Sequence, residues 1–279
     1  MFIPKYTTLD RNRNGRTELT KVSVAATPTD DNLMQEVTHT CGGIKWGDRL
    51  NPQLFYCLTY LLAIVLFLIF VNLQSLPNLY YPTLENLLPV RLFNTKLDRT
   101  LWVEMLWCVH FVRRFGEVLF VYEYQRGITA HEVAAIMLFH AFFSVWIGWS
   151  LNSNLFYRTP PDALFIPGML LCFFGGVGNF ISHKYLQRMS DLRYRHTPAP
   201  HRILPQGGCF QLVDCPHYLF EIITWIGFSL TAFTLASWSF TVATTIILVV
   251  RARRKHIMYQ RVFKDQYPER QKALLPFIL

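Results

Sequence analysis

Long apolar stretches alternate with basic segments along the chain. Residues 54–73 contain no charged side chain, and about 20 apolar residues suffice to cross a hydrocarbon core of ~30 Å. Residues 130–151 and 163–182 are two more stretches of spanning length. Residues 218–250 are also apolar but too long for one span. They predict two helices joined by a tight turn near residues 234–237.

Residues 101–122 are long enough to span a membrane, but they contain ionisable side chains. His110, Arg113, Arg114 and Glu117 follow the spacing i, i+3, i+4, i+7, which places them on one helical face. Two interpretations remain open. The four residues form a structural salt-bridge stripe in which Glu117 neutralises an arginine, or they form an inward-facing polar wall that binds an anionic ligand through the planar arginine fork.

The basic segments predict the topology. They lie in the N-terminal stretch, in residues 183–202 and in residues 251–272. The positive-inside rule places all three on the cytosolic side. This requires four spans between the first and second basic segments and two between the second and third. We therefore expect an all-α, polytopic membrane protein with six transmembrane helices and cytosolic N- and C-termini. Residues 1–50 show no sustained periodicity and are expected to form a polar, weakly folded or flexible cytosolic extension before a transmembrane domain at 51–279.

Composition supports a membrane protein and argues against several other classes. Hydrophobic residues make up 52% and charged residues 16% of the chain, against about 25% charged in soluble domains. The net charge of +9 permits nucleic acid as a partner, but no recognition motif accompanies it, so we expect membrane lipid instead. Cys209, Cys215 and His217 lack the spacing of a zinc knuckle, and no metal is expected.

Two further polar clusters are expected at the cytosolic ends of helices. In the first, Asn179 and His183 lie one turn apart beyond a glycine-rich run that allows close helix approach. Ordinary interhelical hydrogen bonding is the alternative. In the second, His217, Tyr218 and Glu221 follow a proline suited to a first helical turn. The tyrosine is either a proton donor or an aromatic anchor at the membrane surface.

The basic C-terminal segment supplies a third candidate cluster. Arg251, Lys255, His256 and Tyr259 share a helical face. Such a face binds either the phosphates of a dinucleotide or anionic lipid.

Several of these stretches together resemble a known family. LPQGGCFQLVDCPHYLFEIITWIGF, KHIMYQRVFKDQYPERQKALLPFIL, HFVRRFGEVLFVYEYQRG and WSLNSNLFYRTPP are similar to the steroid 5α-reductase superfamily, over roughly residues 100–279. The CPHY tetrad with Glu221 three residues later resembles the very-long-chain trans-2-enoyl-CoA reductases of fatty-acid elongation. The resemblance implies an endoplasmic reticulum membrane fold that binds NADPH in a cytosol-facing cavity and reduces an activated carbon–carbon double bond.

The resemblance also implies roles for individual residues. Tyr218 matches the proton donor, and Arg113 stands where the enoyl-CoA branch has an essential lysine; these two are the predicted catalytic residues. The other matched positions are Arg114, Asn179, His183, His217, Glu221, Arg251, Lys255 and Tyr259. With His256 from the shared basic face, they are the predicted cofactor-binding residues. The implied partners are a long-chain acyl-CoA substrate, membrane lipid and other fatty-acid elongation enzymes.

The chain departs from the family pattern at three places. Phe111 replaces a tyrosine that polarises the substrate carbonyl in the steroid branch, residues 54–73 lack an acid, and CPNY has become CPHY. The first two changes argue against a steroid or polyprenol reductase. All three leave room for a catalytically degenerate scaffold, which the presence of Tyr218, Glu221 and Tyr259 opposes.

Overall fold

The computed structural model describes residues 3–6, 10–11, 17–18, 21–24, 51–72, 95–122, 128–152, 160–196, 204–268 and 271–274. The chain divides into two compact units, Met1–Gly47 and Asp48–Leu279. The first unit contains two antiparallel ladders, which pair β1 (Ile3–Tyr6) with β4 (Lys21–Val24) and β2 (Asp10–Arg11) with β3 (Thr17–Glu18). These strands were not predicted, because short ladders leave no long alternating pattern. The weak folding and cytosolic location of residues 1–50 stay predictions.

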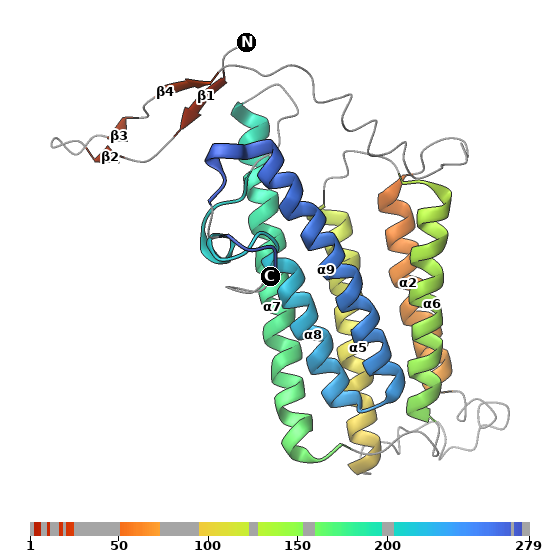
Figure 1. The fold of residues 1–279 in the computed structure, drawn as a ribbon. Coiled ribbons are helices and arrows are strands. Elements are labelled where there is room, and N and C mark those ends of the chain that lie inside the picture. The colour runs from red at the N-terminus through yellow and green to blue at the C-terminus, as the bar shows by residue number, and fades with distance from the viewer. Residues whose placement is uncertain are drawn as a thin grey trace. The chain divides into compact units, whose positions relative to one another are not determined.

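The second unit is built from long helices. They are α2 (Pro52–Val71), α5 (Thr95–Phe120), α6 (Ala130–Asn152), α7 (Asp162–His196), α8 (Pro216–Ala232) and α9 (Leu235–Phe263) (Figure 1). Short 3₁₀ helices lie at Gly208–Gln211 and Lys264–Gln266. Each predicted span coincides with one of these long helices. The all-α class of a polytopic membrane protein is therefore confirmed for this unit.

Membrane-spanning character is clearest in four of the described helices. By length and composition, α2, α6, α9 and the Asp162–Met189 part of α7 qualify as candidate spans. Helix α5 carries the ionisable stripe, and α8 has 17 residues, close to the lower limit for a span. The total of six spans and the cytosolic termini stay predictions.

Two helices extend beyond the apolar stretches that predicted them. The apolar stretch 163–182 continues as helix to His196, through part of the segment 183–202 that we expected to be a basic connection. Helix α9 likewise passes Arg251 and ends at Phe263. Lysine, arginine and glutamine are good helix formers, so a loss of hydropathy marked the membrane surface rather than the helix end.

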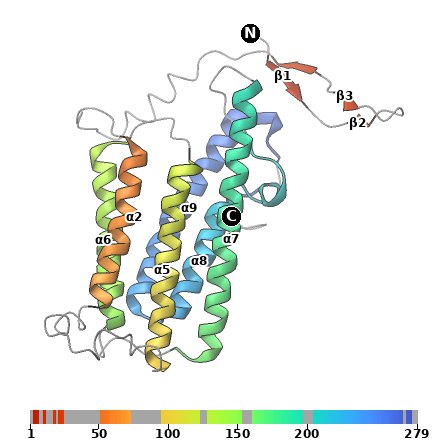
Figure 2. The ribbon, with the colours of Figure 1, turned by 180° about the vertical axis from the view of Figure 1, so that it is seen from behind.

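Glycines bring α7 and α8 together, as the glycine-rich run predicted. A Cβ atom at Gly175 would lie 2.5 Å from the backbone nitrogen of Thr224, and one at Gly227 would lie 2.4 Å from that of Cys172. Both helices run side by side in the two opposite views (Figures 1 and 2). At Gly176, by contrast, a Cβ atom would meet nothing within 4 Å. Only one face of the glycine-rich run is therefore needed for the contact.

The turn between α8 and α9 lies where the long apolar stretch predicted it. Phe233 adopts the left-handed conformation, with φ of 52°. Thr234 caps α9 through a capping box with Ser237, in which side chain and backbone hydrogen bonds run both ways. A left-handed residue followed by a capping box ends one helix and starts the next within two residues.

An aromatic cluster fills the middle of the unit. Trp107 of α5 is fully buried and stacks on Phe67 of α2 with ring centroids 4.9 Å apart. Its ring centroid also lies 4.8 Å from that of Phe111, 5.8 Å from that of Trp225 and 5.8 Å from that of Phe240. Trp107 therefore packs against rings from α2, α8 and α9 as well as from its own helix. In both views α5 lies between the α2–α6 pair and the α7–α8 pair (Figures 1 and 2).

Candidate active site

A cavity of about 830 Å³ lies among α2, α5, α6, α7, α8 and α9. Its polar lining includes eight of the eleven predicted site residues: Arg114, Asn179, His183, His217, Tyr218, Glu221, Arg251 and Lys255. Its other lining is largely aromatic and aliphatic, and it includes Tyr60, Phe111, Phe139, Phe240 and Ile247. The cavity therefore combines polar lining residues, three of them cationic, with apolar ones. We call the eight predicted residues the polar wall.

Glu117 organises the ionisable stripe on α5. Its carboxylate is buried and accepts hydrogen bonds from Arg113 at 3.0 Å, from Arg114 at 2.7 Å and from the Tyr122 hydroxyl at 2.9 Å. Removing one partner of such a buried pair costs about 3–5 kcal/mol, because the other charge is left uncompensated. The stripe is thus a salt-bridge network, as the first interpretation proposed.

Arg114 lines the cavity, which is the position that the second interpretation requires. The binding of an anionic ligand there stays a prediction. Its Nη1 lies 3.4 Å from His183 Nε2 and donates a hydrogen bond to the Tyr122 hydroxyl. Its guanidinium carbon lies 5.9 Å from the ring centroid of Tyr60 on α2. A cation held by Glu117 and aromatic faces is available for an anionic ligand in the cavity.

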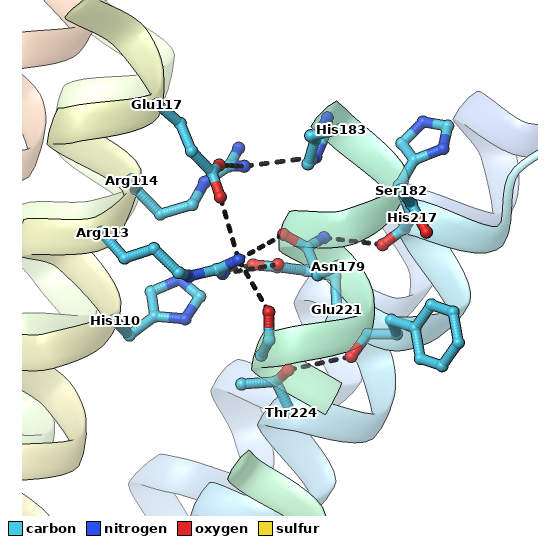
Figure 3. Close-up of polar contacts among 12 residues, drawn as sticks. His110, Arg113, Arg114, Glu117, Asn179, Ser182, His183, His217, Glu221 and Thr224 are labelled. Atoms are coloured by element: carbon cyan, nitrogen blue, oxygen red, sulfur yellow. Dashed lines mark hydrogen bonds and ion pairs between the residues drawn. The ribbon is translucent and has the colours of Figure 1, made fainter. Parts of the chain in front are cut away.

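Arg113 does not line the cavity and contacts α7 instead (Figure 3). Its Nη1 donates hydrogen bonds to the carbonyl oxygen of Gly176 at 3.0 Å and to Asn179 Oδ1 at 2.7 Å. Its Nη2 lies 3.7 Å from Glu221 Oε2, which is too long for a hydrogen bond. These contacts tie α5 to α7, and the catalytic role assigned to Arg113 from the resemblance stays a prediction.

Asn179 continues this connection into α8. Its Nδ2 donates a hydrogen bond of 2.7 Å to the backbone carbonyl of His217, in the first turn of α8 (Figure 3). The next residue is Tyr218. The contacts therefore run from Glu117 through Arg113 and Asn179 to the helix start that carries the predicted proton donor. We call this the Glu117–Arg113–Asn179 network.

Tyr218 lies half-buried in the cavity wall, on a first turn that begins at Pro216 as expected. The Lys255 Nζ lies 5.6 Å from its ring centroid, and the ring of His217 lies 4.2 Å away. A cation beside a phenol stabilises the negative charge that develops on the oxygen as the proton leaves. A cation and an imidazole thus lie beside the phenol ring, and the role of proton donor stays a prediction.

Three cavity-lining side chains have a buried polar atom without a hydrogen-bond partner among the described residues. These atoms are His217 Nδ1, Glu221 Oε2 and Thr244 Oγ1. The other carboxylate oxygen of Glu221 accepts from Trp225 Nε1 at 3.0 Å. An unsatisfied buried polar atom costs about 1–3 kcal/mol. These three atoms are available to hydrogen-bond a ligand in the cavity.

The remaining predicted cofactor-binding residues, His256 and Tyr259, lie outside the cavity lining. His256 Nδ1 is 2.6 Å from a carboxylate oxygen of Asp214, which also accepts from the Tyr267 hydroxyl at 2.8 Å. Burial raises the pKa of Asp214, and the hydrogen bonds from His256 and Tyr267 partly offset that rise. Tyr259 is buried in a small cluster beside Tyr267. Both residues therefore hold the C-terminal segment against the loop before α8.

Sequence reasoning missed several residues of the site. His140 lines the cavity, and its Nδ1 donates to the carbonyl of Ile136 at 2.8 Å. It was detectable as an ionisable residue within an apolar span. Tyr60 and Thr244 gave no such signal, because both residue types are common in membrane helices. In the described part of the chain, no three His, Cys, Asp or Glu side chains converge as a metal site would require.

Comparison of the sequence with known proteins identifies the family of this chain. The family model described as 3-oxo-5-alpha-steroid 4-dehydrogenase matches residues 127–279. A very-long-chain enoyl-CoA reductase of Dictyostelium discoideum is 31% identical over 176 residues, covering 61% of this chain and 55% of that protein. A putative enoyl reductase of Schizosaccharomyces pombe is 29% identical over 251 residues, covering 85% of this chain and 77% of that protein.

A steroid 5-alpha-reductase of Arabidopsis thaliana is 35% identical over 106 residues, covering 37% of this chain and 40% of that protein. The chain spans about half the length of the first curated relatives that it matches. The family model, however, covers more than half of this chain and includes α6 to α9 with most of the cavity's polar wall. The chain therefore belongs to the 3-oxo-5-alpha-steroid 4-dehydrogenase family.

Proposed function

We propose that this protein is an NADPH-dependent reductase of the trans-2 double bond of very-long-chain enoyl-CoA, acting in fatty-acid elongation at the endoplasmic reticulum membrane. The observation that carries this proposal is the cavity, whose lining combines Tyr218 and three cationic side chains with aromatic and aliphatic ones. The similarity to enoyl-CoA reductases supports the choice of substrate. The cytosol is the source of both NADPH and acyl-CoA, so the polar wall of the cavity would face the cytosol.

The residues of the polar wall fit a nicotinamide dinucleotide. Arg114 and Arg251 offer positive charge for its phosphates. Glu221 Oε2 lies 3.7 Å from Arg113 Nη2 but has no hydrogen bond within the described residues, so it is an acceptor for an amide N–H. His217 Nδ1, which likewise has no hydrogen bond there, lies in the same wall. When bound, NADPH supplies the hydride that is added to the β-carbon of the enoyl group.

The chain's own residues would supply the proton and the charge stabilisation. Tyr218 donates its hydroxyl proton to the α-carbon, and the Lys255 ammonium beside its ring stabilises the phenolate that remains. The Glu117–Arg113–Asn179 network fixes the helix start on which Tyr218 lies.

A steroid substrate is the second candidate, favoured by the similarity to the Arabidopsis enzyme. It needs a group that polarises the substrate carbonyl. Phe111 lines the cavity at the position implied for that group and has no hydroxyl. We therefore place the enoyl-CoA thioester first.

The test is a reductase assay on the purified protein in detergent. With NADPH and trans-2-octadecenoyl-CoA we expect loss of nicotinamide absorbance, and with a 3-oxo-4-ene steroid we expect little. Tyr218→Phe should lower kcat by about 10²–10⁴ while NADPH still binds. Turnover of the steroid alone would overturn the substrate assignment, and full activity of Tyr218→Phe would overturn the proton donor.

A further inference from the structure

The cavity is closed on the side that faces the middle of the helical unit. Trp225 and Phe240 meet there with ring centroids 4.6 Å apart, and Phe139 lies 5.6 Å from Phe240. Phe111 completes this layer, 6.1 Å from Trp225, and Trp107 is buried behind it. Phe111 and Phe240 are each 1% exposed. We call these four rings of Phe111, Phe139, Trp225 and Phe240 the aromatic floor.

The aromatic floor prevents a long ligand from extending along the helix axes. Close-packed interiors resist insertion, because added volume forces side chains out of their rotamers. The cavity of about 830 Å³ is of the size that encloses one drug-sized ligand. It does not enclose a dinucleotide together with a very long acyl chain. The chain must therefore leave the cavity by another route.

The exposure of the lining residues shows where the cavity opens. Among its lining residues, only Ala135 on α6 and Ile247 and Arg251 on α9 are exposed. The other lining residues are buried or half-buried. The opening therefore lies between α6 and α9, and we call it the α6–α9 mouth.

The protein surface around the mouth is apolar. Leu138 on α6 is 69% exposed, and Ile246 on α9 is 60% exposed. Both helices qualify as membrane spans, so side chains of this kind face lipid. Arg251 begins the basic part of α9 and lies at one end of the mouth. An apolar opening with a cation at its rim suits an aliphatic chain attached to an anionic head group.

We propose that the α6–α9 mouth is the exit for the acyl chain of the substrate, whose distal part lies in the lipid bilayer during reduction. This inference rests on the proposed enoyl-CoA reductase function. It accounts for how a cavity with a closed floor accepts very long chains. The mouth restricts the width of the chain but not its length, so chain length beyond the mouth costs nothing in the protein.

Narrowing the mouth should therefore discriminate between substrates by chain length. Ala135→Trp and Ile247→Trp place a large ring in the opening. Leu138→Trp and Ile246→Trp are matched controls on the same two helices, exposed to lipid and outside the cavity lining. Each variant is assayed with NADPH and with crotonyl-CoA or trans-2-octadecenoyl-CoA, and its melting temperature is measured.

We expect the ratio of kcat/KM for octadecenoyl-CoA to that for crotonyl-CoA to fall about tenfold or more in the two mouth variants. In the controls the ratio should match that of the parent protein. An equal ratio in mouth and control variants would overturn the α6–α9 exit alone. If the parent reduces neither acyl-CoA, the proposed function fails, and the exit fails with it. Two mouth variants on different helices protect the test against the misfolding of one.

Discussion

Arg113 and Arg114 are adjacent in the sequence but lie in different surroundings. The helical spacing predicted that both belong to one polar wall. In the structure Arg114 faces the cavity, while Arg113 is hydrogen-bonded to α7. Spacing along one helix fixes only the angle between side chains. Which of them meets a cavity depends on where the neighbouring helices pack, and the sequence of α5 alone does not contain that information.

This difference predicts unequal effects of substitution. Arg114→Gln removes a cation from the cavity and should weaken NADPH binding by roughly ten- to a hundredfold, the effect of about 1.4–2.8 kcal/mol. Arg113→Lys should have a much smaller effect on binding. A lysine ammonium carries three donors for the three acceptors that Arg113 Nη1 now contacts, on Glu117, Gly176 and Asn179. Titration of NADPH fluorescence measures both.

The melting temperature of each variant is measured as a control. It distinguishes a loss of NADPH binding from a loss of folding. Arg113→Lys should melt close to the parent protein. If Arg114→Gln binds NADPH as the parent does, Arg114 does not contact the cofactor. If Arg113→Lys loses as much NADPH binding as Arg114→Gln, then it is wrong to assign only Arg114 to the cofactor and Arg113 to the contact with α7.

The polar wall was largely predictable at the residue scale. Ionisable groups are rare in membrane helices, so His110, Arg114 and Glu117 were conspicuous in the sequence. Asp214 was missed, because one aspartate beside Val213 and Cys215 looks like an ordinary surface residue. Its structural role depends on hydrogen bonds with His256 and Tyr267, two residues near the C-terminal end of the sequence. Such a contact is set by the fold and has no local signal.

At the scale of elements, the packing of α7 on α8 depends on particular glycines. Gly175→Ala would place a Cβ atom 2.5 Å from the Thr224 backbone nitrogen, so the helices must separate. Overpacking of this kind costs about 1–3 kcal/mol and should lower the melting temperature by several degrees. The adjacent Gly176→Ala meets nothing within 4 Å. It should leave the melting temperature unchanged or raise it, since alanine favours helix by about 1 kcal/mol.

Gly175→Ala should also reduce NADPH binding, because α8 carries Glu221 and Tyr218 away from α5 when it moves. Thermal unfolding and NADPH titration of the two alanine variants test this directly. Equal melting temperatures for Gly175→Ala and Gly176→Ala would show that the close contact does not support the fold.

Helix positions were more predictable than helix ends. Hydropathy placed each long helix, and the length of residues 218–250 indicated the turn that Phe233 and Thr234 form. The extension of α7 to His196 was missed, because hydropathy reports the membrane boundary. A helix ends where capping or proline stops it, and Pro198 and Pro200 follow shortly after.

At the scale of the whole molecule, the proposed function requires the cationic end of the cavity to face the cytosol. Cys209 is an exposed cysteine in the loop before α8, at the end where the polar wall lies. A membrane-impermeant maleimide added to sealed microsomes, whose outer face is cytosolic, should label it. A Cys41→Ser background removes the N-terminal thiol. The additional Cys209→Ser change should then abolish labelling. Labelling of Cys209 only after detergent is added would place this end in the lumen.

The central claim is that the cavity transfers hydride from NADPH to an enoyl thioester while Tyr218 delivers the proton. Reduction of trans-2-octadecenoyl-CoA with NADPH deuterated at the transferring position of the nicotinamide C4 tests it most directly, with mass spectrometry of the product. We expect one deuterium at the β-carbon in the product, and a much slower reaction with Tyr218→Phe. An unlabelled product, deuterium at the α-carbon, or no reduction would contradict the claim.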